Sequence, residues 1–227
     1  MTKKQSTASS GASSGASPGA SSGASAKARL DTATVVRAAL ELLDEKGVDA
    51  VSMRAIAERL GVRMNTVLWH AKSKARLLDL MADAIVAGVS LDDLPEPCEA
   101  RVRELAHRYR RALLAHRDGA AVVAGTYVAE PATLGAAEEV VRALLDGGLS
   151  EREAAWACFT VIYFVLGLVQ EEQAAPEAGG HRLGGAVGPV SYPALNRVVG
   201  HFESGTFDER FDYGLSLILR SLSLRGA

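Results

Sequence analysis

Helical spacing is the feature that most constrains the fold of this 227-residue chain. Apolar residues recur every three or four positions, and no stretch alternates apolar and polar residues as a half-buried strand would. A capping residue, Asp31 or Thr32, precedes the first apolar series, and Gly47 follows it where a left-handed residue often ends a helix. Aromatic residues make up only 5% of the chain, which also favours helix over sheet. The pattern predicts an all-α fold.

Capping residues and apolar spacing divide the chain into predicted helices. Ser52 and Ser73 each precede a helix, and Ser150 forms a capping-box pair with Glu153. The predicted helices cover 32–46, 53–60, 65–70, a long stretch from 74 onward, 98–116, 133–146, 150–172, 191–203 and 207–223. Residues 174–190 are rich in Gly and Pro and are predicted to form a loop.

The start of the chain differs in composition and charge from the rest. Residues 5–26 repeat a Gly-Ala-Ser unit, which cannot bury enough apolar surface to offset its ordering entropy, so a disordered tail is expected over 1–28. Residues 1–76 carry 12 Lys/Arg against 6 Asp/Glu, whereas residues 77–227 carry 13 against 21. Such an asymmetry suggests a nucleic-acid-binding end.

Cysteine usage and hydropathy indicate a compartment. Cys98 and Cys158 are too few for a disulfide framework or a zinc cluster, which fits a reducing cytosol. The amino terminus has no apolar stretch typical of a signal peptide. The longest uncharged apolar run, Ala154 to Gln170, is slightly short for a membrane span and contains a glycine. We expect a buried helix there, and a cytoplasmic protein that does not enter a membrane.

The segment Met53–His70 has the spacing of a helix-turn-helix. This motif needs a small residue where two short helices approach, a glycine in the turn and an apolar residue inside the second helix. Ala57, Gly61 and Val67 supply these residue types in that order. An ordinary corner between two helices has the same spacing, so spacing by itself leaves both DNA binding and a structural corner open.

Several segments, in order, resemble the TetR family of repressors. Over Arg29–Leu78 the matching residues are Leu30-Asp31, Ala39–Leu43, Gly47, Arg54, Ala57, Leu60-Gly61-Val62, Trp69-His70 and Lys72-Ser73-Lys74. Ala112–Ala120 with Gly125-Thr126, and Leu166-Gly167 with Glu171-Glu172-Gln173, resemble the tetracycline-repressor branch of the family. The resemblance implies a three-helix helix-turn-helix DNA-binding domain over 29–76 and a helical effector-binding and dimerisation domain over 77–227.

The resemblance also indicates which side chains meet DNA. Arg54 matches a base-contacting position, and a guanidinium suits guanine O6 and N7. Met64 and Asn65 open the recognition helix, where a thymine methyl and an adenine edge are their natural partners. They replace the glutamine and proline of the tetracycline branch, so we expect a different operator sequence. The expected phosphate contacts, which fix register, are Thr66, Trp69, His70 and Lys74.

The effector domain departs from the tetracycline branch where that branch binds metal. A histidine there holds the magnesium ion carried by the drug, and Val123 takes its place in this chain. Because valine cannot ligate a metal, we expect neither a metal site nor a cofactor. Thr126 and Glu171 match the branch and are expected at the ligand site.

Four further ligand-site positions are altered relative to that branch. Leu105 stands in place of an asparagine and Tyr163 in place of a histidine. Tyr109 replaces a phenylalanine and Tyr127 an arginine. The altered positions predict a less polar pocket whose tyrosines stack on a flat aromatic ligand.

Together these features predict a ligand-responsive repressor that binds a palindromic double-stranded DNA operator as a homodimer. Its inducer is expected to be small, aromatic and metal-free, as in efflux or antibiotic-related control. The dimer interface is expected on the helices at 150–172 and 207–223, which are apolar over more than one face. An effector-independent or architectural DNA-binding protein is one alternative, and a helical ligand-binding module or enzyme is another. No catalytic residue grouping is recognisable in the sequence, so we do not expect an enzyme.

Overall fold

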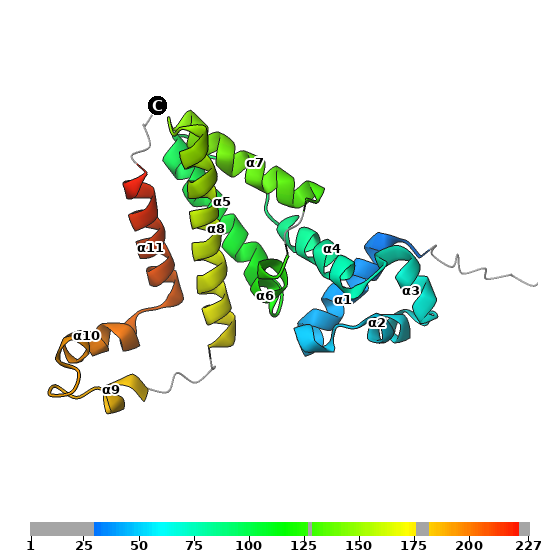
Figure 1. The fold of residues 1–227 in the computed structure, drawn as a ribbon, viewed down its shortest axis with the longest axis horizontal. Coiled ribbons are helices and arrows are strands. Elements are labelled where there is room, and N and C mark those ends of the chain that lie inside the picture. The colour runs from blue at the N-terminus through cyan, green and yellow to red at the C-terminus, as the bar shows by residue number, and fades with distance from the viewer. Residues whose placement is uncertain (1–29, 127–128, 176–181, 223–227) are drawn as a thin grey trace, which may run out of the picture. The chain divides into compact units, whose positions relative to one another are not determined.

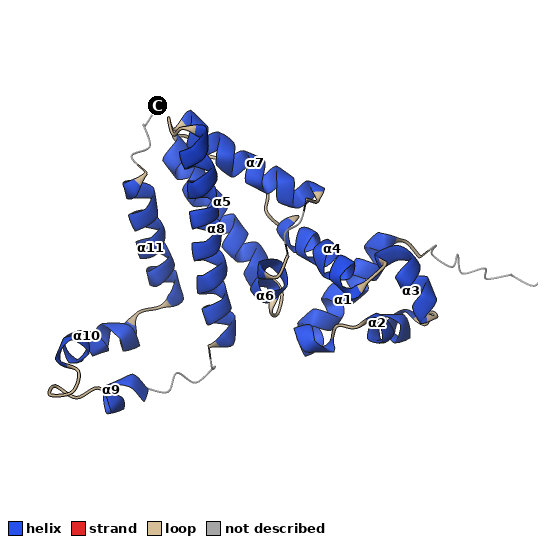
Figure 2. Cartoon of the chain, in the orientation of Figure 1, coloured by secondary structure: helices blue, strands red, loops and turns tan. Residues whose placement is uncertain are grey.

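The computed structural model describes residues 30–126, 129–175 and 182–222, and all its regular elements there are helices (Figures 1 and 2). They are α1 (Thr32–Lys46), the 3-10 helix η1 (Val48–Ala50), α2 (Met53–Leu60), α3 (Met64–Ala71), α4 (Lys74–Val86), α5 (Cys98–Leu114), α6 (Gly119–Ala124), α7 (Pro131–Asp146), α8 (Glu151–Ala174), α9 (Arg182–Ala186), α10 (Pro193–Ser204) and α11 (Phe207–Ser221). The prediction of an all-α fold is confirmed. The tail expected over 1–28 lies outside the described residues.

The short elements are where the sequence prediction was incomplete or wrong. Neither η1 nor α6 was predicted from spacing, because three to six residues hold too little periodicity to detect. α9 lies inside 174–190, which was wrongly predicted to be loop throughout. The backbone N–H of Gly184 in α9 donates to the Glu203 carboxylate of α10 at 2.8 Å. This hydrogen bond from α9 to Glu203 therefore stabilises a short helix in a stretch whose glycines favour a loop.

The first four α-helices pack around a common core. Side chains cap three of them, because Asp31, Ser52 and Ser73 each accept a hydrogen bond from the backbone N–H three residues later, at 2.7, 3.2 and 3.1 Å. The helices bury one apolar face each against the others, as their 3.6-residue spacing predicts. The fully buried side chains of this core include Val35, Leu43, Ile56, Val67, Leu77 and Met81.

The remaining long helices form a second packed group. α5, α7 and α8 contact one another, α11 packs along α8, and α6 contacts both α4 and α8 (Figure 1). The approach of α11 to α8 depends on Gly214, because a Cβ there would lie 2.5 Å from the ring of Phe164. Figure 1 shows α8 and α11 running alongside each other as a result. The large buried side chains of this group include Leu105, Leu113, Leu144, Phe211, Leu215 and Leu219.

A buried arginine joins three helices of this group. Arg110 of α5 is only 8% exposed, and its guanidinium donates to both carboxylate oxygens of Glu172, near the end of α8, at 2.8 to 3.1 Å. The same guanidinium donates to Asp208 in the first turn of α11 at 2.6 Å and lies 5.0 Å from the ring centre of Phe211. The carboxylates of Glu172 and Asp208 thus compensate the positive charge, as the burial of a guanidinium requires.

Candidate functional site

The joint between α2 and α3 has the geometry that its spacing predicts. Gly61 ends α2 in the left-handed conformation, with φ +64°, and its backbone N–H donates to carbonyls of the preceding turn. Ala57 is buried at the contact between the helices, and its carbonyl also accepts from the backbone N–H of Val62 at 3.0 Å. Val67 of α3 is fully buried. The small residue, the turn glycine and the apolar residue therefore hold α3 against α2 as in a helix-turn-helix.

α3 presents most of the predicted DNA contacts on its surface. Met64 and Asn65 are exposed at its start, and Trp69 is 73% exposed near its end. The Nζ atom of Lys72 lies 4.7 Å from the centre of the Trp69 ring, so the indole supports a cation at the surface. Thr66 and His70 are half-buried, whereas Lys74 at the start of α4 is exposed.

Arg54 is also exposed, but its guanidinium is not free. It donates to Glu58, one turn later on α2, at 3.0 Å, and both side chains lie mostly in solvent. An exposed pair of this kind contributes little to stability because water screens it. The contact engages only Nε of Arg54, so Nη1 and Nη2 remain available to donate to a guanine edge.

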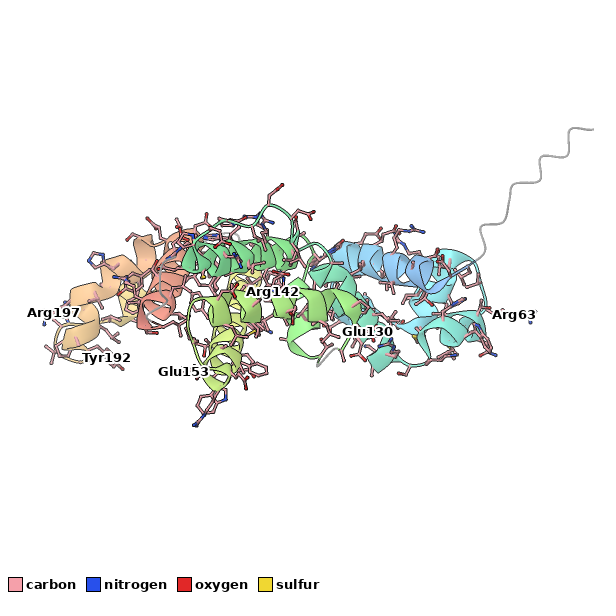
Figure 3. The ribbon with its side chains drawn as sticks, turned by 90° about the horizontal axis from the view of Figure 1, so that it is seen from above. Arg63, Glu130, Arg142, Glu153, Tyr192 and Arg197 are labelled. Carbon is pink, nitrogen blue, oxygen red and sulfur yellow. The ribbon has the colours of Figure 1, made fainter. Side chains whose placement is uncertain are left out.

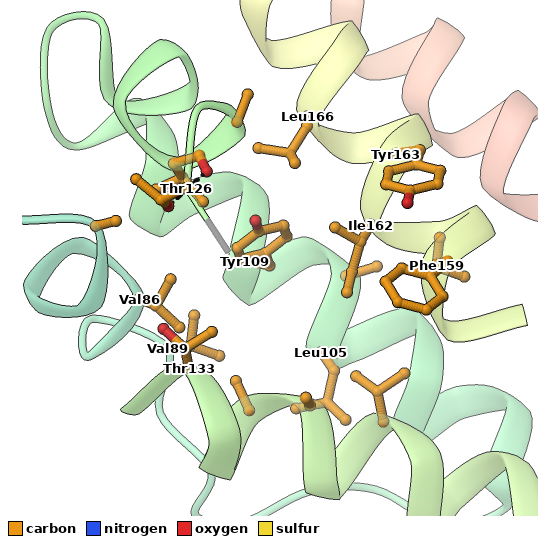
Figure 4. Close-up of a pocket in the computed structure, with 18 of the residues that line it drawn as sticks. Val86, Val89, Leu105, Tyr109, Thr126, Thr133, Phe159, Ile162, Tyr163 and Leu166 are labelled. Atoms are coloured by element: carbon orange, nitrogen blue, oxygen red, sulfur yellow. Dashed lines mark hydrogen bonds between the residues drawn. The ribbon is translucent and has the colours of Figure 1, made fainter. Parts of the chain in front are cut away.

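An apolar cavity of about 570 Å³ lies among α4, α5, α6, α7 and α8 (Figure 4). Five of the seven predicted ligand-site residues line it: Leu105, Tyr109, Val123, Thr126 and Tyr163. Tyr127 lies outside the described residues. Glu171 is exposed and is not among the lining residues, because the α8 face that meets the cavity carries Leu166, Gly167 and Gln170 at that end.

Several lining residues were not predicted from the sequence. α8 contributes Phe159 and Ile162, one turn before Tyr163 and Leu166, so helical spacing did contain their signal. α4 and α7 contribute more of the wall, and no local pattern shows that these two helices meet there. Their lining side chains include Ala82, Val86, Thr133, Leu134, Ala136, Ala137 and Val140.

Few polar groups remain available inside this cavity. The Thr126 hydroxyl donates to the Val123 carbonyl at 2.9 Å, and the Thr133 hydroxyl donates to Asp83 at 2.9 Å. The Tyr109 hydroxyl has no hydrogen-bond partner within the described part of the chain. Burial raises the pKa of this hydroxyl above its ordinary value, and nearby Cys158 adds to the shift. Tyr109 therefore stays protonated and offers a ligand a hydrogen-bond donor in apolar surroundings.

α4 connects this cavity to the helix-turn-helix. Its residues Ala82 and Val86 line the cavity, and only two residues separate its start from the end of α3. Arg76 of α4 donates to the Glu130 carboxylate just before α7 at 2.6 Å. The carboxylate of Asp83 on α4 accepts from Thr133 in the first turn of α7. A change in the cavity wall at α7 would therefore act on α4 directly.

A second connection joins α1 to the turn before α6. The Asp44 carboxylate of α1 lies 3.0 Å from Nδ1 of His116 and accepts from the backbone N–H of Arg117 at 3.1 Å. Asp118 in turn accepts from the backbone N–H of Val48, just after α1, at 2.9 Å. Two carboxylates, one from each side, thus hold the α6 corner to the helix-turn-helix domain.

A helix-turn-helix connected through α4 to an apolar cavity defines a ligand-responsive transcriptional regulator. Residues 35–81 match the family model of bacterial regulatory proteins of the tetR family, and residues 93–224 match the tetracyclin repressor-like C-terminal domain. The chain belongs to the TetR family of transcriptional regulators. It is a transcriptional repressor that binds an operator and responds to a small molecule, and it is not an enzyme.

Three relatives illustrate the range of this similarity. The class A tetracycline repressor of Escherichia coli is 39% identical over 87% of this chain and 92% of its own length. ActR of Streptomyces coelicolor, solved in complex with actinorhodin, is 30% identical over 86% of this chain and 96% of its own, with a TM-score of 0.78. BioQ, solved with its double-stranded DNA operator, is 26% identical over 86% of this chain and 99% of its own, with a TM-score of 0.66.

α8 has a high mean hydropathy over most of its length. By length and composition this helix could cross a membrane, and a third of its most apolar window is buried in the protein. It lies within residues 93–224, the part that matches the tetracyclin repressor-like C-terminal domain. The contacts of α8 with α5, α7 and α11 agree with a helix of that domain.

Proposed function

We propose that this repressor binds a palindromic operator as a homodimer and is released by a largely apolar, polycyclic aromatic ligand that needs no divalent metal. In this proposal the chain comprises a DNA-binding domain over 29–76 and an effector-binding and dimerisation domain over 77–227. The protein acts in the cytoplasm. The observation that carries the ligand proposal is the apolar cavity, which is bounded by five helices and lined by aromatic side chains. The observation that supports the dimer is an exposed apolar face.

The exposed α8–α11 face is defined by apolar side chains that the described helices of the protomer leave exposed. Trp156 and Tyr163 on α8 are each 58% exposed, and Tyr213 on α11 is 66% exposed. Phe159 and Leu217 extend this face. Large clustered apolar side chains on a soluble protein mark an interaction surface. A second copy related by a two-fold axis would cover the face, and the same axis would relate the two halves of a palindrome.

The proposed ligand class follows from the chemistry of the cavity wall. Phe159 and Tyr163 stack on each other with ring centres 5.6 Å apart, and Tyr109 adds a donor hydroxyl. Aromatic walls with few polar groups favour flat apolar ligands. Val123 lines the cavity with a side chain that cannot ligate a metal, so chelation would not contribute to binding. That ActR, a relative in fold and sequence, was solved with actinorhodin makes this compound a suitable first probe.

Release from DNA requires that the ligand favour one arrangement of the two DNA-binding domains over another. A ligand with equal affinity for both arrangements would shift nothing. We propose α4 as the lever, because it lines the cavity with Val86 and leads directly from α3. Asp83 and Arg76 couple α4 to the start of α7, so an occupant that displaces α7 would also move α4.

A gel-shift titration tests this proposal. The full chain would first select its operator from random duplex DNA, and the selected site would then be titrated with actinorhodin, tetracycline and citrate, each with magnesium and with EDTA. We expect the polycyclic aromatic compounds to release the DNA equally well in EDTA. Release that depends on magnesium would show that the metal-free assignment is wrong. Release by citrate would contradict the aromatic assignment, and a selected site without two-fold symmetry would favour the architectural alternative.

A further inference from the structure

The recognition helix α3 begins differently from its neighbours. Asp31, Ser52 and Ser73 cap α1, α2 and α4 through side-chain oxygens, whereas Arg63 occupies the same position before α3 and makes no capping hydrogen bond. An arginine there also places a positive charge at the positive end of the helix dipole, which is unfavourable. Local departures of this kind from helix-forming rules are expected at functional positions.

The guanidinium of Arg63 is also uncommitted. Within residues 31–76, which the structure describes without a gap, the other four arginines all have side-chain partners. Arg54 pairs with Glu58, and Arg59 pairs with Glu41 and Glu45. The remaining two are Arg37, bonded to Thr34, and Arg76, bonded to Glu130. Arg63 is exposed and projects away from the ribbon beyond α3 (Figure 3).

We propose that Arg63 reads a guanine in each half-site of the operator. The backbone of Arg63 is extended, with φ −74° and ψ 146°, so its side chain leaves the chain just ahead of Met64 and Asn65. Residues at the start of a recognition helix are those that reach base edges in the major groove. A free guanidinium there can donate two parallel hydrogen bonds to guanine O6 and N7. The inference rests on α3 being the recognition helix, and Arg63 is then a specificity residue next to those predicted from the sequence.

Selection from random duplex DNA, with the full-length wild-type protein and the R63A and R63K variants, tests the proposal. In the wild-type site, one symmetric pair of guanine positions should depend on Arg63, with guanine preferred by about tenfold over the other bases. R63A should lose that preference and keep the rest of the site. R63K should keep the dependence of affinity on salt but lose most of the preference, because an ammonium cannot form the two parallel bonds. R142A, which removes an exposed arginine of α7, is the matched control and should select the wild-type site.

The outcomes separate this inference from the proposed function. A symmetric site that R63A selects unchanged would overturn the role of Arg63 and leave the dimeric repressor intact. Uniformly weaker binding by R63A, with a smaller salt slope and unchanged base preferences, would make Arg63 a phosphate contact and also overturn guanine reading. A wild-type protein that selects no sequence would overturn both. Equal melting temperatures for R63A and the wild type would show that the fold is unaffected.

Discussion

Asp83 of α4 accepts hydrogen bonds from both the backbone N–H and the hydroxyl of Thr133, at 2.8 and 2.9 Å. α4 thereby supplies the cap for the first turn of α7, whose own N-cap residue, Glu130, makes no side-chain capping bond. Thr133 also lines the cavity, so a bound ligand and the Asp83 carboxylate would contact the same residue. This contact gives the cavity a second connection to α4, through α7, beside the direct contribution of Ala82 and Val86 to the wall.

Replacing Asp83 with alanine should uncouple these two helices. The lost cap is expected to lower the free energy of unfolding by about 1 kcal/mol, measured in urea. With the actinorhodin-type ligand at saturation, the variant should keep its ligand affinity but release the operator less completely than the wild type. Asp83→Asn retains an acceptor oxygen and serves as the matched control. Full release by Asp83→Ala would contradict the proposed route through α7.

The DNA contacts predicted from the sequence should separate into two kinds. Arg54→Ala and Asn65→Ala should each relax base preference at one position per half-site, at a cost of about 1–3 kcal/mol for the preferred sequence. Lys74→Ala should weaken binding to all sequences alike and reduce the slope of log affinity against log salt concentration by about 1. Affinities measured at several salt concentrations on single-base operator variants distinguish these effects. An Arg54→Ala protein with wild-type base preferences would contradict the base contact.

A charge placed on the exposed α8–α11 face should separate the proposed dimer. Tyr213→Glu and Leu217→Glu put a carboxylate into an interface that we expect to be apolar and two-fold symmetric, so each substitution enters it twice. Sedimentation at micromolar concentration should show a shift from dimer towards monomer and a parallel loss of operator affinity. Leu145→Glu changes a similarly exposed leucine on α7 and should remain dimeric. A wild-type protein that sediments as a folded monomer would refute the dimer itself.

The glutamates of the two capping boxes, Glu153 and Glu209, make the stability of the protein sensitive to acid. Hydrogen bonds from Ser150 and Thr206 hold the pKa values of Glu153 and Glu209 below their ordinary value of 4.5. Because these pKa values are depressed on folding, the stability they contribute is complete above pH 4.5 and is lost as the pH falls through the folded-state values. Urea unfolding should therefore become easier in this acidic range. Glu153→Gln still caps α8 without titrating and should reduce the pH dependence.

Local rules predicted most of the fold. The caps at Asp31, Ser52 and Ser73 and the turn at Gly61 depend on neighbouring residues alone, and their helices begin or end where expected. α9 instead receives a contact from Glu203 of α10, which is too far along the chain for the spacing of apolar residues to reveal. The sequence therefore predicted the helices of eight residues or more well, and missed those of six residues or fewer.

The residues that line the cavity were likewise predicted only where a recognisable local segment carries them. Resemblance to the family led to Leu105, Tyr109 and Val123 because α5 and α6 carry recognisable segments. The contributions of α4 and α7 arise from packing between helices that are distant in sequence, and no motif marks Thr133. Glu171 was predicted at the site, but one residue along a helix turns a side chain by about 100°. Glu171 therefore lies outside the cavity lining, and the neighbouring Glu172 pairs with Arg110.

The chain between Glu172 and Asp208 leaves and re-enters the helical domain at a single guanidinium, that of Arg110. Outside α9 and α10, the length of the connecting segments in this stretch changes the free energy little, because each doubling of a flexible loop adds only about 0.6 kcal/mol of closure entropy. Insertions and deletions in this stretch should therefore accumulate over evolution without disturbing the cavity or the α8–α11 pair.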